Sequence, residues 1–164
     1  MNDKIKEIIS YVLIIIIVLL IKQYIVTPIR VNGNSMNNTL ENKDIMILDK
    51  ISYRFSNIKR FDIVVIKKEK EYLIKRVIGL PGDMVEYKNN ELYINQEKVT
   101  EDFKHLETKD YVLESLIPFG YYFVVGDNRP DSLDSRVIGL ISEEEILGKT
   151  SLVIFPFKRF GVKE

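Results

Sequence analysis

Cysteine is absent from this chain of 164 residues, and histidine occurs once, as His105. Without cysteine there is no thiol catalysis, no disulfide bond and no cysteine-based zinc site, and the redox compartment stays undecided. A zinc shell would need further His or Cys ligands beside His105, so we expect no metal and no other cofactor. His105 itself lies in a polar, irregular stretch and is predicted to be a solvated surface residue.

An excess of charge of either sign is also missing, since 24 Lys and Arg residues balance 24 Asp and Glu residues. The lysines are scattered and form no single basic block, so no overall field attracts nucleic acid or an acidic substrate. We therefore expect no nucleic-acid partner. The length allows one membrane segment and one domain with a sizeable core, but no second full domain.

Long uncharged runs are confined to the beginning of the chain. Residues 8–21 carry no charge and are almost wholly aliphatic, Lys22 interrupts the run, and apolar residues resume up to Val26. A membrane span needs about 20 residues, which the whole stretch 8–26 nearly supplies. Lys22 would lie near one end, where its ammonium can reach the interface. The sequence predicts a short tail over 1–7 and a retained transmembrane anchor over 8–26.

Two other interpretations of this run remain. It could be the apolar part of a removable signal peptide, although no Ala-x-Ala-like cleavage site follows it. It could also be a buried helix, although all its sides are apolar, whereas a surface helix of a small soluble domain has a polar face. Basic residues flank both ends of the run, so charge alone does not fix its orientation.

Short β-like runs take over beyond Arg30. They imply an all-β domain of antiparallel strands, a sheet or barrel-like arrangement, and they cover residues 44–48, 62–66, 72–80, 84–87, 91–94, 121–125 and 151–155. Asn89-Asn90 and Pro81-Gly82 are expected to form turns. Residues 100–118 are polar and are expected to form an excursion from the sheet. Ser142 has capping-box spacing to Glu145, which predicts one short helix ending near Gly148.

A serine and a lysine are the strongest candidates for chemistry. Ser35 follows the apolar run closely, with Gly33 nearby to permit tight backbone geometry. A Ser-His-Asp triad would have to use His105, so the base is sought elsewhere. Lys75 lies in strand 72–80, where period-2 alternation puts it on one face with aliphatic neighbours. That strand could be an exposed edge, or it could bury the lysine, lower its pKa and let the amine accept a serine proton.

A dense polar loop, residues 126–136, follows the apolar run 121–125. It holds three carboxylates, two arginines and two serines within eleven residues. One interpretation is a solvated turn. The other is a loop that fixes a catalytic group through hydroxyls and internal ion pairs such as Asp134 with Arg136.

Together these stretches resemble the bacterial type I signal peptidases, membrane-bound serine proteases that remove signal peptides from exported proteins. The resemblance covers nearly the whole chain, and the short anchor and brief 100–118 insertion resemble Gram-positive members. Its motifs are Gly33–Met36 with Thr39-Leu40, Arg60–Val65, Lys75-Arg76 with Gly79–Asp83, and Gly126–Asn128 with Ser132, Asp134, Ser135 and Arg136.

The resemblance implies a role for several residues. Ser35 would be the nucleophile and Lys75 the general base, while Ser132 would orient the lysine amine. Asp134 and Arg136 would buttress that loop. Residues 27–164 would form the peptidase domain on the extracytoplasmic side of the cell membrane, held by a single-pass anchor.

The implied substrates are exported preproteins with small residues at positions −1 and −3. Shallow apolar pockets carry that preference in the family, and Val31, Met36, Leu40 and Ile74 match them by position; such pockets reject larger side chains by overpacking. Besides preproteins, only membrane lipids are expected as partners, and the protein is expected to be a monomer. The rival hypothesis is a non-catalytic, membrane-tethered β-domain that binds preproteins.

Two positions depart from the family pattern. Many Gram-negative members have serine where Gly33 stands, and many members have proline where Asn38 stands. Gly33 offers no side-chain donor to an oxyanion. The oxyanion hole is therefore expected to use backbone amides, including that of Ser35.

Overall fold

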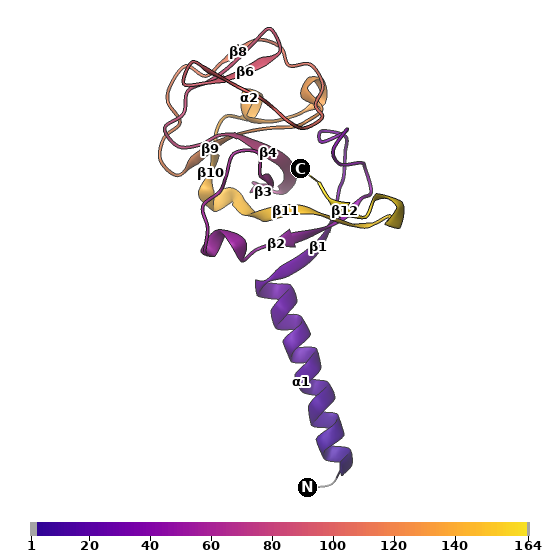
Figure 1. Ribbon diagram of the computed structural model, residues 1–164. Helices are drawn as coiled ribbons and strands as arrows, with labels where there is room; N and C mark the ends of the chain where they lie inside the picture. The colour runs from indigo at the N-terminus through magenta and orange to yellow at the C-terminus, as the bar shows by residue number, and fades with distance from the viewer. Residues whose placement is uncertain (1–2, 164) are drawn as a thin grey trace.

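A long helix and a β-rich body make up the computed structural model, which describes residues 3–163 (Figure 1). Helix α1 spans Asp3–Tyr24 and projects from the body. No helix among residues 3–163 combines the length and hydropathy required of a membrane span. The helix is offset from the predicted anchor 8–26, since it begins before residue 8 and ends at Tyr24. Val26 already belongs to strand β1 (Val26–Arg30), because the ring of Pro28 disfavours helical backbone at Thr27.

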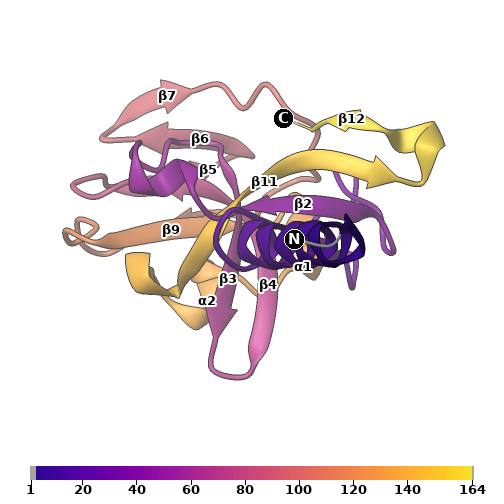
Figure 2. The same ribbon diagram turned by 90° about the horizontal axis from the view of Figure 1, so that it is seen from below.

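Within the described residues the strands form two antiparallel sheets, which confirms the antiparallel all-β prediction. The larger follows the order β1-β2-β11-β3-β4-β9-β10, with β12 paired to β11, and the smaller follows β7-β6-β5-β8. Figure 2 shows α1 end-on beneath β2 of the larger sheet. The larger sheet adds to β1 the strands β2 (Ile45–Asp49), β3 (Ile63–Lys68), β4 (Glu71–Gly79), β9 (Tyr121–Val125), β10 (Ile141–Ser142), β11 (Ile146–Phe155) and β12 (Gly161–Val162). The smaller consists of β5 (Val85–Lys88), β6 (Glu91–Ile94), β7 (Glu97–Val99) and β8 (Tyr111–Val112).

Each of the seven predicted β runs falls on a strand, although 151–155 is only the second half of β11. The turn between β5 and β6 is confirmed, since Asn89 and Asn90 have φ of 52° and 63°. The short strands β1, β7, β8, β10 and β12 were not predicted. Four of them, β7, β8, β10 and β12, contain only two or three residues, too few for a period-2 pattern to show, whereas Pro28 interrupts the five residues of β1.

The predicted helix after Ser142 is shorter than expected. Its capping box is present, with the Ser142 amide donating to Glu145 Oε2 at 2.9 Å. Only a 3-10 turn over Glu143–Glu145 forms, and β11 begins at Ile146. Gly148 is therefore no helix terminus. It lies in an irregularity of β11, where an added Cβ would overlap the Asp49 carbonyl. The other short helical pieces are Ser52–Arg54, Arg129–Asp131, α2 (Ser135–Ile138) and Phe157–Arg159.

Residues 100–118 pack onto the body and do not form the expected excursion. Strand β8 pairs with β5, and Ile117 joins a buried cluster with Ile78, Tyr87 and Phe123. His105 is not solvated surface. Its side chain is only 16% exposed and lies 3.6 Å from Glu101. The segment's polar residues make buried contacts that its composition does not reveal.

Strand β4 lies between β3 and β9, so the exposed-edge interpretation is wrong. Both of its central charges are buried: Lys75 is 2% exposed and Arg76 is 1% exposed. Lys75 pairs with Val64 of β3, and Arg76 pairs with Ile63 of β3 on one flank and with Val125 of β9 on the other. A cation in this position must find partners or lose its proton.

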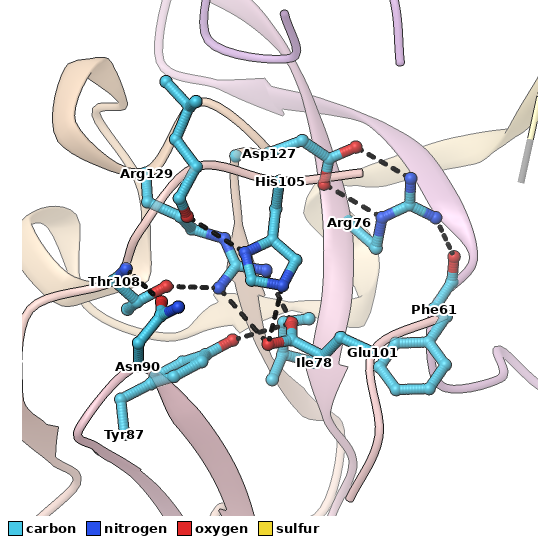
Figure 3. A network of polar contacts seen from close by, with 12 residues as sticks. Phe61, Arg76, Ile78, Tyr87, Asn90, Glu101, His105, Thr108, Asp127 and Arg129 are labelled. Carbon is cyan, nitrogen blue, oxygen red and sulfur yellow. Dashed lines mark hydrogen bonds and ion pairs between the residues drawn. The ribbon is translucent and has the colours of Figure 1, made fainter. Parts of the chain in front are cut away.

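Arg76 finds its partners in a buried polar network (Figure 3). Its guanidinium donates to both carboxylate oxygens of Asp127, at 2.9 and 2.7 Å, and to the Phe61 carbonyl at 3.0 Å. Its carbon lies 3.8 Å from the centre of the Phe103 ring. Thr39 donates to the same carboxylate at 2.5 Å. The network thus ties β4 to the start of the loop after β9.

Removing one member of this pair should be more costly than removing both. Asp127→Ala leaves the Arg76 charge buried and unpaired, so we expect a loss of about 3–5 kcal/mol of unfolding free energy. The double variant Arg76→Met/Asp127→Leu should recover most of that loss. Urea unfolding followed by circular dichroism measures both.

The exposed pair Lys98 with Glu91 serves as the matched control. Lys98→Ala should leave the unfolding midpoint unchanged, because solvent screens this pair. An Asp127→Ala protein as stable as the Lys98→Ala protein would contradict the proposed importance of the buried pair.

Candidate active site

Ser35 and Lys75 are in direct contact. The Lys75 amine and the Ser35 hydroxyl lie 2.6 Å apart. Lys75 is brought there by the central strand β4, and Ser35 by the tight turns that follow β1. The two residues are forty positions apart in sequence, so only the sheet brings them together.

The turn that carries Ser35 is held from two directions. On one side, the Leu40 and Thr39 amides donate to the Met36 carbonyl at 2.8 and 3.1 Å. On the other, the Asn128 amide donates to the Ser35 carbonyl at 3.0 Å, and its side-chain amide donates to the Asn34 carbonyl at 3.0 Å. The loop after β9 thereby fixes the backbone of the serine.

Burial lowers the pKa of Lys75 to about 8 from its ordinary value of 10.5. Removal from water is the largest cause, because it disfavours the ammonium form. The negative charges of Asp134 and Asp127 oppose this shift, while the positive charge of Arg136 adds to it. The amine is therefore neutral in a large fraction of molecules at mildly alkaline pH.

Asp134 and Arg136 form the ion pair expected from the sequence. Arg136 donates through Nε and Nη2 at 2.9 and 2.8 Å, and it also donates to the Arg129 carbonyl at 2.7 Å. The Gly126 amide donates to the same carboxylate at 3.0 Å. Burial alone would raise the pKa of Asp134, but the hydrogen bonds from Arg136, Ser132 and Gly126 hold it below its ordinary value.

Ser132 lies close to the Ser35 backbone but makes no hydrogen bond with Ser35 or Lys75. Among residues 3–163 its buried hydroxyl has no partner within strict hydrogen-bond geometry, and no bond joins it to Lys75. It is still close enough to Asp134 to help lower the pKa of that carboxyl. Its position is fixed by Gly126: a Cβ added there would overlap both the Ser132 hydroxyl and the Ser35 carbonyl. Ser132 and Ser35 thus flank the same glycine.

A cavity of about 500 Å³ opens beside the two residues, between β1 and β4. Ser35 and Lys75 lie in its wall together with the apolar residues Val31, Met36 and Ile74. Leu40, the fourth expected pocket residue, is fully buried and does not line the cavity. It packs behind Val31 and Met36 in one apolar cluster.

The Ser35 amide is among the backbone amides of this turn that make no hydrogen bond within the described residues. The Gly33 amide donates to the Asn42 side chain at 3.3 Å, whereas none of the hydrogen bonds found within residues 3–163 uses the Ser35 amide. Asn38 has φ of 87°, a value that the proline ring, with φ near −65°, excludes. Asn38 therefore stands where many family members have proline because its backbone conformation here is one that proline cannot adopt.

Sequence reasoning assigned no individual role to Gly126, Asp127 or Asn128. The signals for them were their place at the start of the dense polar loop and their membership of the family motif Gly126–Asn128. No group of three or more His, Cys, Asp or Glu side chains within the described residues is arranged to hold a metal ion. The site consists of a hydroxyl, a neutralisable amine and the loop that positions them.

Comparisons with known proteins show the family to which the chain belongs. Residues 4–155 match the family described as signal peptidase, peptidase S26. Signal peptidase IB of Staphylococcus aureus is 37% identical over 178 residues, covering 97% of this chain and 93% of that protein. Signal peptidase I of Bacillus caldolyticus is 43% identical over 146 residues, which is 80% of both chains.

A solved structure is similar as well. The crystal structure of a signal peptidase I from Enterococcus faecalis V583 superposes with a TM-score of 0.52 at 38% identity, covering 57% of this chain and 97% of that one. The chain therefore belongs to the signal peptidase family, peptidase S26, and is a signal peptidase I, a serine endopeptidase that removes signal peptides from preproteins.

Proposed function

We propose that Ser35 and Lys75 form the catalytic dyad with which this peptidase cleaves preproteins. The observation that carries the proposal is the 2.6 Å contact between the serine hydroxyl and a lysine amine that is almost fully buried. At pH 8 an ordinary lysine with pKa ~10.4 is neutral in only about 1 molecule in 250. A pKa of about 8 makes the neutral form available in about half of the molecules at that pH.

The chemistry follows from this pair. The neutral Lys75 amine accepts the proton of the Ser35 hydroxyl as Oγ attacks the scissile carbonyl carbon. The Ser35 amide donates to the developing oxyanion. The Lys75 ammonium then protonates the departing amine, which leaves an acyl-enzyme. The neutral Lys75 amine finally takes a proton from the water that hydrolyses the ester. It passes this proton to the Ser35 oxygen as the acyl group leaves, and Ser35 is regenerated.

Ser132, Asp134 and Arg136 support Lys75 in this proposal. The Ser132 hydroxyl has no strong partner of its own, which leaves its hydrogen-bonding capacity for the lysine amine. Asp134 and Arg136 present opposite charges to that amine, so their pairing limits the net field on it. The ion pair therefore holds the loop without forcing Lys75 into its charged form.

The apolar wall of the cavity supports a preference for small residues at positions −1 and −3. Val31, Met36 and Ile74 narrow the space next to Ser35, and larger substrate side chains would overpack it. Leu40 acts from behind this wall by keeping Val31 and Met36 in place. The preference is thus a consequence of limited volume.

Helix α1 is proposed to be the single-pass membrane anchor, with residues 27–164 on the extracytoplasmic side. Its apolar side chains between Ile8 and Ile21 are 40–62% exposed on all sides of the helix. An apolar surface of this extent needs a partner, and lipid provides one. Its 22 residues give a length of about 33 Å, close to the ~30 Å of a bilayer's hydrocarbon core.

Lys75→Met should eliminate turnover while holding or raising stability. We expect kcat to fall by roughly 10²–10⁴-fold, the usual contribution of a general base. The lowered pKa means that the folded protein loses this proton at lower pH than the unfolded chain, at a cost of about 3 kcal/mol below pH ~8. The stability gain of the variant should therefore be largest at neutral pH and vanish above pH ~10.5. Thermal unfolding at several pH values measures it.

Lys67→Met, which changes an exposed lysine of the adjacent strand β3, is the control for that experiment. It should leave both kcat and the pH dependence of stability unchanged. Substantial turnover by the Lys75→Met protein would refute the assignment of the base.

Gly126→Ala should lower kcat strongly by moving the nucleophile. The added methyl group would overlap the Ser35 carbonyl, which cannot turn aside as a side chain could. A fall in kcat on the order of 10²-fold corresponds to a displacement of about 1 Å. Steady-state hydrolysis of a short peptide measures the change.

Gly79→Ala is the matched control, because its methyl group would also meet neighbours, the side chains of Ile117 and Val85. It should lower the melting temperature and leave kcat of the folded protein intact. If both alanine variants kept kcat, the contact between Gly126 and Ser35 would have no catalytic importance.

The proposed topology predicts that a reporter enzyme fused after residue 164 is active only outside the cytoplasm. A chain that begins at Ile25 should no longer sediment with membranes after alkaline extraction, whereas the full chain should. Reporter activity confined to the cytoplasm would overturn the topology.

A further inference from the structure

A second hollow lies against helix α1, directly next to the catalytic cavity. It measures about 560 Å³, and six helix residues line it: Ile16, Leu19, Leu20, Lys22, Gln23 and Tyr24. Four of them, Ile16, Leu19, Leu20 and Gln23, recur at i, i+3, i+4 and i+7 and therefore form one stripe along α1. We call them the α1 stripe.

The hollow on α1 and the catalytic cavity share two residues, Thr27 and Lys50. The Lys50 amine donates to the Gln23 and Lys22 carbonyls at 3.2 and 3.5 Å, where the last turn of the helix leaves acceptors free. Thr27 donates to the Lys22 carbonyl at 2.8 Å, and the Lys50 amide donates to the Ile25 carbonyl at 2.9 Å. These four bonds fix the direction of the helix relative to the cavity.

The signal peptide of a preprotein matches the two adjoining hollows, because its cleavage site and its apolar segment follow each other along the chain. A signal peptide carries an apolar segment of about 7–15 residues just ahead of its cleavage site. As a helix that segment is about 10–22 Å long. Thr27 and Lys50 line both hollows, so they join the cavity that holds Ser35 to the end of the α1 stripe.

We propose that the α1 stripe is the docking surface for the apolar helix of the signal peptide. The inference rests on the proposed dyad and on the proposed membrane anchor. The two helices run side by side with the same orientation, and packing between aliphatic side chains holds them in lipid. Gln23 offers the one amide of the stripe to a polar group on the substrate helix. Docking raises the local concentration of the cleavage site and does not touch the reacting atoms.

Site-specific photo-crosslinking tests the contact. The full chain carrying Ser35→Ala is reconstituted in phospholipid vesicles with a preprotein, and a photoreactive residue replaces either Leu20 or Val18. Val18 lies on the opposite side of α1 and lines neither hollow. The product between enzyme and signal peptide should be at least about threefold stronger from position 20. Equal yields from the two positions would overturn the proposal.

Kinetics separate this proposal from that of the dyad. Leu19→Ala/Leu20→Ala should raise KM for the vesicle-bound preprotein by about 3–10-fold and leave cleavage of a short peptide without an apolar segment unchanged. Ile14→Ala/Ile21→Ala removes the same number of carbon atoms from the opposite side of the helix and should change neither. Equal effects of the two double variants, or an equal loss on the short peptide, would overturn docking on the stripe. The dyad would fail instead if the Lys75→Met protein still cleaved the short peptide at a substantial rate.

Discussion

The loss of water around the Lys75 amine is the constraint on which this site depends. An amine at the centre of a sheet cannot keep its proton at ordinary cost, and the pKa of about 8 is the consequence. The neutral Lys75 amine can act as a base only because the Ser35 hydroxyl lies within hydrogen-bond distance of it. Gly126 makes that distance possible, because any side chain there would push the Ser35 carbonyl away. Desolvation and close packing therefore act on the same pair of atoms.

Charges around the dyad are paired with one another, which limits how far the carboxylates raise the pKa of Lys75. Arg76 binds Asp127, Arg136 binds Asp134, and Arg129 binds Glu101 of the segment after β7 at 2.5 Å. Each pair joins the loop after β9 to itself or to another part of the chain. Buried ion pairs of this kind contribute little net stability, but breaking one is costly. Their main effect here is to hold the backbone of the loop against the turn that carries Ser35.

Sequence patterns located seven of the twelve strands in the described residues and named Ser35 and Lys75 as candidates, but they did not predict the contacts between the strands. Alternation located β4, and the absence of a second histidine directed attention to Lys75, but local sequence could not distinguish an edge strand from a central one. That distinction depends on β9 pairing with β4 from nearly fifty residues away. The segment 100–118 was misjudged for the same reason, since its polar residues are satisfied by Arg129 and by β5. Leu40 matched a pocket position in the family, yet the fold puts it behind the wall.

The most direct test of this account is the pH dependence of acyl-enzyme formation in a single turnover of the unmodified enzyme. The rate of that step reports the neutral fraction of the base before any product is released. The account predicts an ascending limb with its midpoint near pH 8, the pKa that burial gives Lys75. A midpoint near pH 10.4, the value of a solvated lysine, or a rate independent of pH would contradict the role of the desolvated amine.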